Sequence, residues 1–199
     1  YNNAMLTNMN ERHFHQVMLM GRPGVTGVPE TLSALKNYLT SLHVDLLIEK
    51  NTDSIMGKHS LPIVHSEKIP KDCDLIIVVG GDGSLLSAAH AALPYDLPVL
   101  GINRGRLGFL TDIHPDELTK IQAILDGHYH QEKRFLLQTQ LTHDGKTRWQ
   151  GIALNDAVLL PGNLAQMIEF DVKVNEQFVC SQRADGMIVA TPTGSTAYA

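Results

Sequence analysis

Apolar and polar positions follow two different patterns along this chain, and the change between them falls near residue 130. The most apolar segment of the first part is residues 75–80, in which every residue is apolar or glycine. Such a run is typical of a strand that is buried on both faces, as in a parallel sheet. Shorter apolar runs predict further strands at residues 16–20, 44–48 and 98–102.

Helices are predicted between these strands. Pro29 suits the first turn of a helix, and apolar residues follow it at helical spacing, at Leu32, Leu35, Leu39 and Leu42. A second helix is expected after residue 83, and a third from His114 to Gly127. Residues 51–70 are poorly patterned, and we expect a loop there with one short element at most. Strands that alternate with helices predict an α/β domain with a parallel sheet over residues 12–130.

Beyond residue 130 the helical pattern gives way to alternation with a period of two. Residues 167–174 alternate most cleanly, and Asp144-Gly145 is typical of a hairpin turn. Further strands are predicted at residues 135–141, 149–160, 178–180 and 187–190. We therefore expect residues 131–199 to form an all-β domain. Only some of the strands that such a domain needs are present, so we expect it to be incomplete in this chain.

Composition narrows the functional classes. The 199 residues carry a formal charge of −5 and have a pI near 6.0, which gives no reason to expect a nucleic-acid partner. No apolar run reaches the roughly 18 residues that a membrane span needs, and no secretory leader is evident. Cys73 and Cys180 lie far apart without motif spacing. A reduced, cytoplasmic protein is the simplest account.

The most informative polar residues follow the strand at residues 75–80. Gly80, Gly81 and Gly83 surround a single carboxylate, Asp82, and we expect Ser84 to cap the helix that follows. A glycine turn between a strand and a helix N-terminus is suited to phosphate, because backbone N–H groups and the helix dipole point at it. A lone carboxylate there indicates nucleotide chemistry with Mg²⁺, or a general base. The alternative is a tight turn whose glycines supply positive φ.

Two more polar segments interrupt apolar runs. Residues 103–110 follow the next strand, and the carboxyl ends of parallel strands share one edge of a sheet, where ligands bind. The alternative is an ordinary loop in which Arg104 and Arg106 are solvated. Asn155 and Asp156 lie inside an apolar run, where polar groups are costly to bury unless they are bonded. A β-bulge or a strand end would also explain this pair.

Residues 183–186 and 191–198 flank the strand predicted at 187–190. The second segment is rich in hydroxyls and backbone donors and has one aromatic ring, which suits the amide, ribose and phosphate groups of a nucleotide. A Ser/Thr-rich loop is the alternative. Histidines spaced two apart, at His13 and His15 and again at His128 and His130, lack the further ligands that a metal needs. We expect these histidines to be solvated.

Taken together, these motifs resemble the NAD kinase family, of the bacterial kind. The resemblance rests on five blocks in order: Gly-Gly-Asp-Gly at 80–83, Asn-x-Gly-x-Leu-Gly-Phe-Leu at 103–110, Asn-Asp at 155–156, Arg-x-Asp-Gly at 183–186 and Thr-Pro-Thr-Gly-Ser-Thr-Ala-Tyr at 191–198. It implies phosphorylation of the adenosine ribose 2′-hydroxyl of NAD⁺, giving NADP⁺. ATP, another nucleoside triphosphate or polyphosphate would be the donor, with Mg²⁺.

The resemblance also implies residue roles, with Asp82 as the proton acceptor. By the resemblance, the dinucleotide contacts Asp82, Gly83, Asn155, Asp156, Arg183, Asp185, Thr196, Ala197, Tyr198 and Ala199. By the same resemblance, the donor contacts Gly80, Gly81, Gly83, Asn103 and Arg104. No side chain is assigned to the metal, and Gln166 stands where relatives often carry a histidine or another basic residue.

The resemblance further implies a C-terminal portion that completes the β domain, and a homo-dimer or homo-tetramer in which some NAD contacts cross a subunit interface. We expect this chain to be truncated at its C-terminus. Two alternatives stay open. A lipid kinase of the diacylglycerol or sphingosine kinase type shares the Gly-Gly-Asp-Gly turn and the two-domain plan, and a catalytically silent NAD-binding module would share the binding motifs.

Overall fold

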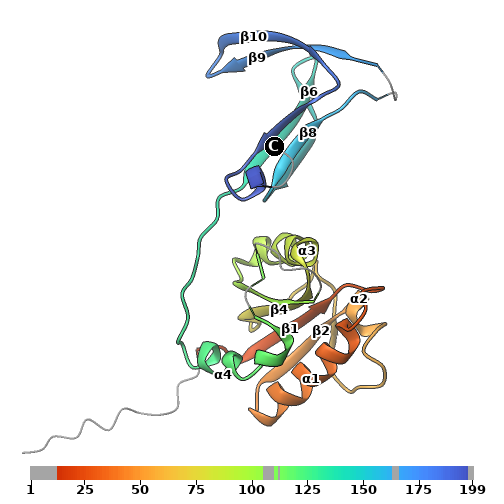
Figure 1. The fold of residues 1–199 in the computed structure, drawn as a ribbon, viewed down its shortest axis with the longest axis vertical. Helices are drawn as coiled ribbons and strands as arrows, with labels where there is room; N and C mark the ends of the chain where they lie inside the picture. Colours follow the sequence, from red (N-terminus) through yellow and green to blue (C-terminus); the bar gives the residue numbers. More distant parts are fainter. Residues whose placement is uncertain (1–12, 105–109, 112, 163–165, 197–199) are drawn as a thin grey trace, which may run out of the picture. The chain divides into compact units, whose positions relative to one another are not determined.

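The chain divides into two units, residues 1–130 and residues 131–199. The computed structural model describes residues 13–104, 110–111, 113–162 and 166–196. The first unit is a sheet with helices packed on it, and the second consists of paired strands (Figure 1). Each unit is described here by itself.

The first unit is built on five parallel strands, which confirms the predicted α/β class. Along the chain they are β1 (Gln16–Gly21), β2 (Asp45–Glu49), β3 (Ile63–Val64), β4 (Leu75–Gly80) and β5 (Val99–Asn103). Their order in the sheet is β3-β2-β1-β4-β5, and all neighbours pair in parallel. Strand β4 lies between β1 and β5, and all of its residues are buried. The loops that follow β1, β4 and β5 therefore leave the sheet along one continuous stretch of its carboxyl edge.

Helices cover both faces of this sheet. Helix α1 (Val28–Ser41) packs on one face through Leu32, Leu35 and Leu39, together with α4 (Lys120–Leu125). Helix α3 (Asp82–Ala92) packs on the other face through Ala88 and Ala92. Both layers bury the aliphatic side chains of the central strands, since neighbouring residues of a strand point to opposite faces. This two-layered core holds the carboxyl edge in place.

Two expectations for this unit need correction. Residues 51–70 were expected to hold one short element at most. They contain most of a short helix, α2 (Lys50–Asp53), and the edge strand β3. The helix expected from His114 to Gly127 is divided into a 3₁₀ turn, η2 (Pro115–Glu117), and α4. A capping box at His114 closes the short turn, because the Glu117 carboxylate accepts the backbone N–H of His114. A second 3₁₀ turn, η1 (Leu93–Tyr95), follows α3.

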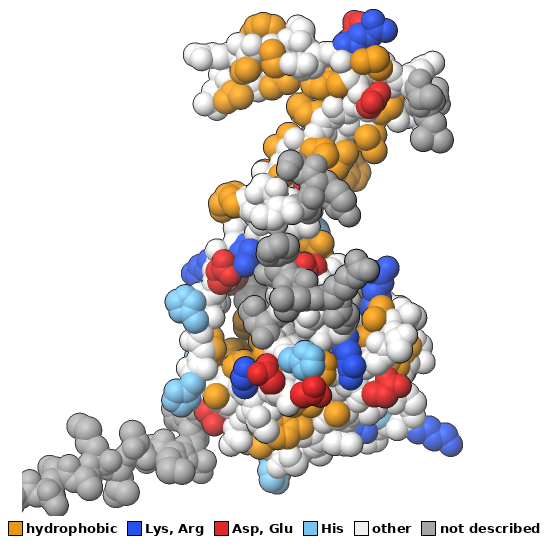
Figure 2. Space-filling model, in the orientation of Figure 1, with side chains coloured by type: hydrophobic (Ala, Val, Ile, Leu, Met, Phe, Trp, Pro, Cys, Tyr) orange, Lys and Arg blue, Asp and Glu red, His pale blue; other side chains and the backbone are white. Residues whose placement is uncertain are grey.

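The second unit consists of three antiparallel pairs, which confirms the predicted β-rich region. They are β6 (Leu137–His143) with β7 (Lys146–Ala153), β8 (Asp156–Leu159) with β11 (Met187–Ala190), and β9 (Ile168–Val174) with β10 (Gln177–Ala184). Large apolar side chains on these strands are exposed, Trp149 and Phe178 among them, and hydrophobic side chains are prominent on this unit in Figure 2. A 3₁₀ turn, η3 (Gly194–Thr196), follows β11.

The single strand expected over residues 149–160 is divided between β7 and β8. The break falls at Leu154 and Asn155, whose carbonyl groups accept hydrogen bonds from Thr191 instead of from a neighbouring strand. Asn155 therefore lies at a strand end, one of the alternatives left open by its sequence. Among the described residues, no helix is both long and apolar enough to cross a membrane.

Cys73 belongs to the apolar layer beneath α3, where it is 3% exposed. Burial raises the pKa of its thiol to about 11, because an apolar surrounding disfavours the charged thiolate. At pH 8 about one Cys73 thiol in a thousand is then ionised, and the thiolate is the form that reacts with alkylating agents.

We therefore predict that iodoacetamide leaves Cys73 unmodified at pH 8 in the native protein. After unfolding in guanidinium chloride the same residue should react at the rate of an ordinary cysteine, as read by peptide mass spectrometry. Rapid native modification of Cys73 at pH 8 would contradict its place in the buried layer.

Candidate functional site

Helix α3 begins almost directly where the buried strand β4 ends. Gly81 alone separates them and serves as the N-cap, with φ −98° and ψ −169°. The carbonyl of Gly81 accepts the N–H groups of Ser84 at 2.9 Å and Leu85 at 3.2 Å. The expectation that Ser84 caps this helix is therefore wrong, since Ser84 lies inside the first turn and none of the described side chains caps α3. The start of α3 is thus closed by the backbone of Gly81, and the positive end of the helix dipole is directed at the turn.

The glycine at position 80 is required by a close approach. A Cβ at Gly80 would overlap both the hydroxyl and the Cβ of Ser84, which is itself buried. Gly81 has open space around its Cβ position, and neither Gly81 nor Gly83 has a positive φ. Positive φ is therefore not the reason for the glycines at 81 and 83. The absence of a side chain at Gly80, whose φ of +158° also disfavours other residues, lets the first turn of α3 lie against the end of β4.

Asp82 is the first residue of α3, at the positive end of the helix dipole. Its Oδ1 accepts the backbone N–H of Leu110 at 3.1 Å. Leu110 lies beyond the end of β5, so this bond ties the segment after β5 to the turn after β4. Asp82 is partly exposed, so its carboxylate is held at a defined place and can still be reached from solvent.

Asn103 ends β5 directly beside Gly80, with which it is paired in the sheet. It is 9% exposed, and its side-chain oxygen is buried with no hydrogen-bond partner among the described residues. Positions 101 and 103 point to the face covered by α3, because a Cβ at Gly101 would meet Leu85 of that helix. The structure thus brings an unpartnered amide oxygen near the first turn of α3.

Arg104 contacts the glycine turn through its backbone and not through its side chain. Its backbone N–H donates to the carbonyl of Gly80 at 2.9 Å. Its guanidinium leads to α1, where Nε donates to Thr31 Oγ1 at 2.6 Å and where the group packs against Gly27. The side chain of Arg104 therefore joins β5 to the start of α1 and does not point at the glycine turn.

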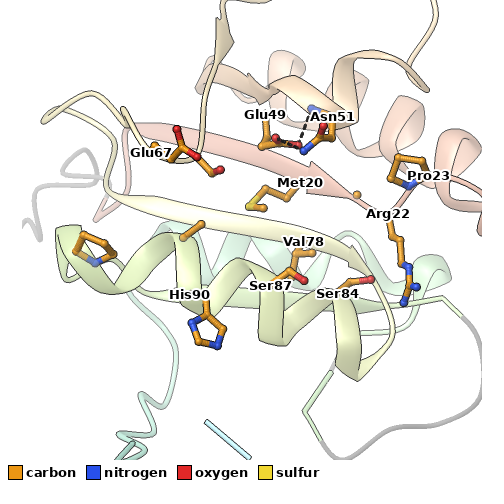
Figure 3. Close-up of a pocket in the computed structure, with 14 residues that line it drawn as sticks. Met20, Arg22, Pro23, Glu49, Asn51, Glu67, Val78, Ser84, Ser87 and His90 are labelled. Atoms are coloured by element: carbon orange, nitrogen blue, oxygen red, sulfur yellow. Dashed lines mark hydrogen bonds between the residues drawn. The ribbon is translucent and has the colours of Figure 1, made fainter. Parts of the chain in front are cut away.

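Arg22 was not singled out from the sequence, yet it lies beside the turn. It follows β1 in an exposed loop, and a Cβ added at Gly83 would lie 3.6 Å from its Nη1. Arg22 also lines a pocket of about 660 Å³ between α3 and the ends of β1 and β2 (Figure 3). The parallel order that places β1 next to β4 could have identified this residue, since both strands end at one edge.

In the second unit, Asn155 lies against the segment that follows β11. The N–H of Thr191 donates to the Asn155 carbonyl at 2.8 Å, and a Cβ at Gly194 would overlap that same carbonyl. The Asn155 side-chain oxygen is buried, and no residue in the part of the chain that the structure describes forms a hydrogen bond with it. Two motifs that lie apart in sequence, residues 155–156 and 191–196, are thus adjacent in the structure. Asp156 and Thr196 belong to this group by position, in β8 and η3.

Arg183 and Asp185 lie at and just beyond the end of β10. Both are exposed, and Arg183 Nε stands 3.9 Å from the carboxylate of Glu169 on the paired strand. Gln166 is exposed too. The remaining candidate residues, Arg106, Ala197, Tyr198 and Ala199, lie outside the described residues.

The two histidine pairs lie at the surface of the first unit. His13, His15, His128 and His130 are exposed, and His13 Nε2 lies 2.8 Å from the Tyr129 hydroxyl. Over the part of the chain that the structure describes, no three His, Cys, Asp or Glu side chains are grouped as metal ligands.

Comparison with known families and proteins gives consistent matches. The family model described as ATP-NAD kinase N-terminal domain matches residues 29–132, and that described as ATP-NAD kinase C-terminal domain matches residues 154–199. The chain is 58% identical to the NAD kinase of Coxiella burnetii (strain RSA 493 / Nine Mile phase I) over 195 residues, which are 98% of this chain and 65% of that protein. It is 52% identical to the NAD kinase of Pseudomonas fluorescens (strain SBW25) over 94% of this chain and 64% of that protein. The chain therefore spans less than two thirds of the length of these relatives.

Two solved structures share the fold. One is a yeast NADH kinase complexed with NADH, with a TM-score of 0.78 and 25% identity over 95% of this chain and 60% of the other. The other is an NAD kinase from Archaeoglobus fulgidus in complex with ATP, with a TM-score of 0.64 and 25% identity over 92% of this chain and 63% of the other.

The close approach at Gly80 generates a stability prediction. In Gly80→Ala the new methyl group must displace Ser84, and overpacking of this kind costs about 1–3 kcal/mol. The matched control is Gly81→Ala, because a Cβ at Gly81 meets open space. Denaturant unfolding should therefore show a clear loss of free energy of unfolding for G80A and a much smaller change for G81A. Equal losses in the two variants would contradict the contact as the reason for the glycine.

Proposed function

This chain belongs to the NAD kinase family, and we propose that the protein transfers a phosphoryl group from ATP to the 2′-hydroxyl of the adenosine ribose of NAD⁺, giving NADP⁺. The observation that carries the proposal is the placement of Asp82, a carboxylate at the start of α3 on a glycine turn. The strong likeness to curated NAD kinases supports it.

In the proposed reaction Asp82 is the general base. A ribose hydroxyl is a weak acid, and a carboxylate within hydrogen-bond reach can take its proton as attack proceeds. The ribose oxygen forms a bond to the γ-phosphorus, the bond from that phosphorus to the bridging oxygen breaks, and ADP leaves. Phosphoryl transfer depends chiefly on position and on compensation of charge. The backbone N–H groups at the start of α3 are suited to that compensation.

We propose Asp82 and Gly83 as dinucleotide contacts in the first unit. For the second unit we propose the contacts Asn155, Asp156, Arg183, Asp185, Thr196, Ala197, Tyr198 and Ala199. The buried amide oxygen of Asn155 supports a polar ligand there, because a buried acceptor without a donor is costly. The solved structure of the yeast relative contains NADH, which supports a dinucleotide as the ligand that we propose here.

For the donor we propose the turn residues Gly80, Gly81 and Gly83 with Asn103, and the backbone of Arg104. The side chain of Arg104 is engaged with Thr31, so Arg22 is the better candidate for a cation at the phosphates. The Archaeoglobus fulgidus relative, whose structure holds ATP, supports ATP as the donor.

Mg²⁺ fits this proposal as a partner of the donor phosphates. The ion takes oxygen ligands and usually keeps several waters and substrate oxygens around it. The unpartnered amide oxygen of Asn103 is an oxygen ligand of the right kind near the turn. When bound, Mg²⁺ would compensate charge on the phosphates.

We also propose a homo-dimer or homo-tetramer in the cytoplasm, on the strength of the family likeness. The exposed apolar side chains of the second unit, such as Trp149 and Phe178, are consistent with burial in a larger assembly. The reported matches favour neither a lipid kinase nor a silent NAD-binding module.

Replacement of the proposed base gives the direct test. In the complete protein, Asp82→Asn should lower kcat for NADP⁺ formation at least about 100-fold, because general base catalysis contributes about 10²–10⁴-fold. The affinity for NAD⁺ should stay close to that of the wild type, since the shape of the side chain is kept. NADP⁺ is read with an NADP-specific dehydrogenase, and NAD⁺ binding by calorimetry.

The matched control is Asp126→Asn, the same chemical change at an exposed residue that ends α4. It should leave both kcat and NAD⁺ affinity unchanged. Near-normal turnover in D82N would remove Asp82 as the base, whatever the effect on NAD⁺ binding.

A further inference from the structure

A buried carboxylate outside the proposed catalytic residues lies at the end of β2. Glu49 is 4% exposed, and its Oε2 accepts the N–H groups of Asn51 at 2.9 Å and Thr52 at 3.0 Å. Its Oε1 accepts from the Asn51 side chain at 3.0 Å. Burying a carboxylate is costly unless its oxygens are bonded in this way. These bonds fix the orientation of the carboxylate.

Thr52 connects this carboxylate to the end of β1. Its side chain is fully buried, and its hydroxyl lies 3.1 Å from Glu49 Oε2. The same hydroxyl oxygen accepts the backbone N–H of Gly21 at 2.9 Å and lies 3.3 Å from the Gly21 carbonyl. When the Thr52 hydroxyl donates its hydrogen bond to Glu49 Oε2, its oxygen is free to accept the backbone N–H of Gly21. Glu49, Thr52 and Gly21 thus form one hydrogen-bonded chain.

Gly21 is confined from its other side by α1. A Cβ added at Gly21 would lie 2.7 Å from Leu32 Cδ1 and 2.9 Å from Val28 Cγ1, so the backbone packs directly on that helix. In the sheet Gly21 is paired with Val79, which places the next residue, Arg22, level with Gly80. The end of β1 is therefore held between α1 and Thr52 at the point where Arg22 leaves the sheet.

Arg22 and Glu49 both line the pocket beside α3, and Figure 3 shows the Arg22 side chain extending toward the start of that helix near Ser84. The helix start carries Asp82 and is the positive end of the helix dipole, which favours a negatively charged ligand. An arginine beside such a turn adds a planar cation that recognises phosphate through several N–H groups. A flexible side chain binds better when its backbone is already fixed.

We propose that Glu49 and Thr52 are positioning residues for the phosphoryl donor: they hold Gly21 so that Arg22 meets the phosphates of a nucleoside triphosphate at the first turn of α3. The proposal rests on the proposed function for the identity of the donor. Thr52 acts only through Arg22, and so a change at Thr52 should matter for ATP and not for NAD⁺.

The test is a double-mutant cycle on the complete protein, with the Kd of Mg²⁺–ATP measured by calorimetry. Thr52→Val keeps the shape and removes the hydroxyl, and it should raise the Kd about fivefold, the value of one hydrogen bond. Arg22→Ala should raise it about tenfold or more, because a charge-assisted bond to phosphate is lost. In the R22A background, the T52V change should have no further effect on the Kd.

Conservative and control variants separate positioning from a loss of structure. Thr52→Ser keeps the hydroxyl and should restore the wild-type Kd. Thr40→Val, at an exposed threonine of α1, makes the same chemical change away from the pocket and should leave the Kd unchanged. A T52V effect that persists in full in the R22A background, or a T52V Kd equal to that of the wild type, would overturn the proposal.

The readout also keeps the two proposals apart. ATP binding that follows the cycle while the wild-type protein forms no NADP⁺ would support the positioning role and contradict the proposed function. If the wild-type protein forms NADP⁺ but T52V does not change the affinity for ATP, the proposed function would be supported and the positioning role contradicted. A wild-type protein with no affinity for Mg²⁺–ATP would contradict both.

Discussion

The close approach between Gly80 and Ser84 is the contact on which the site depends. Strand β4 is buried along its whole length, so its end cannot shift without disturbing both layers of the core. Because Gly80 carries no side chain, the first turn of α3 can lie directly against that end. The helix then begins at Asp82, and the core fixes the place of the carboxylate. The catalytic role that we propose for Asp82 thus follows from packing as well as from charge.

The carboxyl edge of the parallel sheet gathers the other groups of the first unit. Loops after β1, β4 and β5 leave neighbouring strands, and they are tied together by backbone bonds from Arg104 to Gly80 and from Leu110 to Asp82. Arg22 and Asn103 stand on either side of the turn as a cation and an unpartnered amide oxygen. Arginine binds phosphate oxygens and an amide oxygen can ligate a metal ion, so these two groups support the donor site that we propose.

The strand and helix pattern of the first unit could be predicted from sequence, because buried parallel strands are continuous apolar runs and helix stripes have a clear period. The α/β class, the β-rich second part and the family were all predicted correctly. The contacts that individual side chains make could not be predicted from sequence. Arg104 sits in a motif that resembles a ligand loop, yet its guanidinium binds Thr31 of a helix far away in sequence. Arg22 lies in an unremarkable loop and becomes a candidate only through the order of the strands.

The N-cap of α3 was also predicted wrongly from sequence, because serine is a preferred N-cap residue and Ser84 follows the glycine turn. The residue roles assigned through the family likeness remain predictions, among them those of Asn155, Arg183 and Asp185. The strand break at Asn155 arises from carbonyl bonds to Thr191, which no local pattern reveals.

The central claim is tested most directly by incubating the complete protein with ATP, Mg²⁺ and NAD⁺ and locating the transferred phosphate by ³¹P NMR. The account predicts NADP⁺ with the phosphate on the adenosine 2′-oxygen, and ATP consumption without NADP⁺ would contradict it.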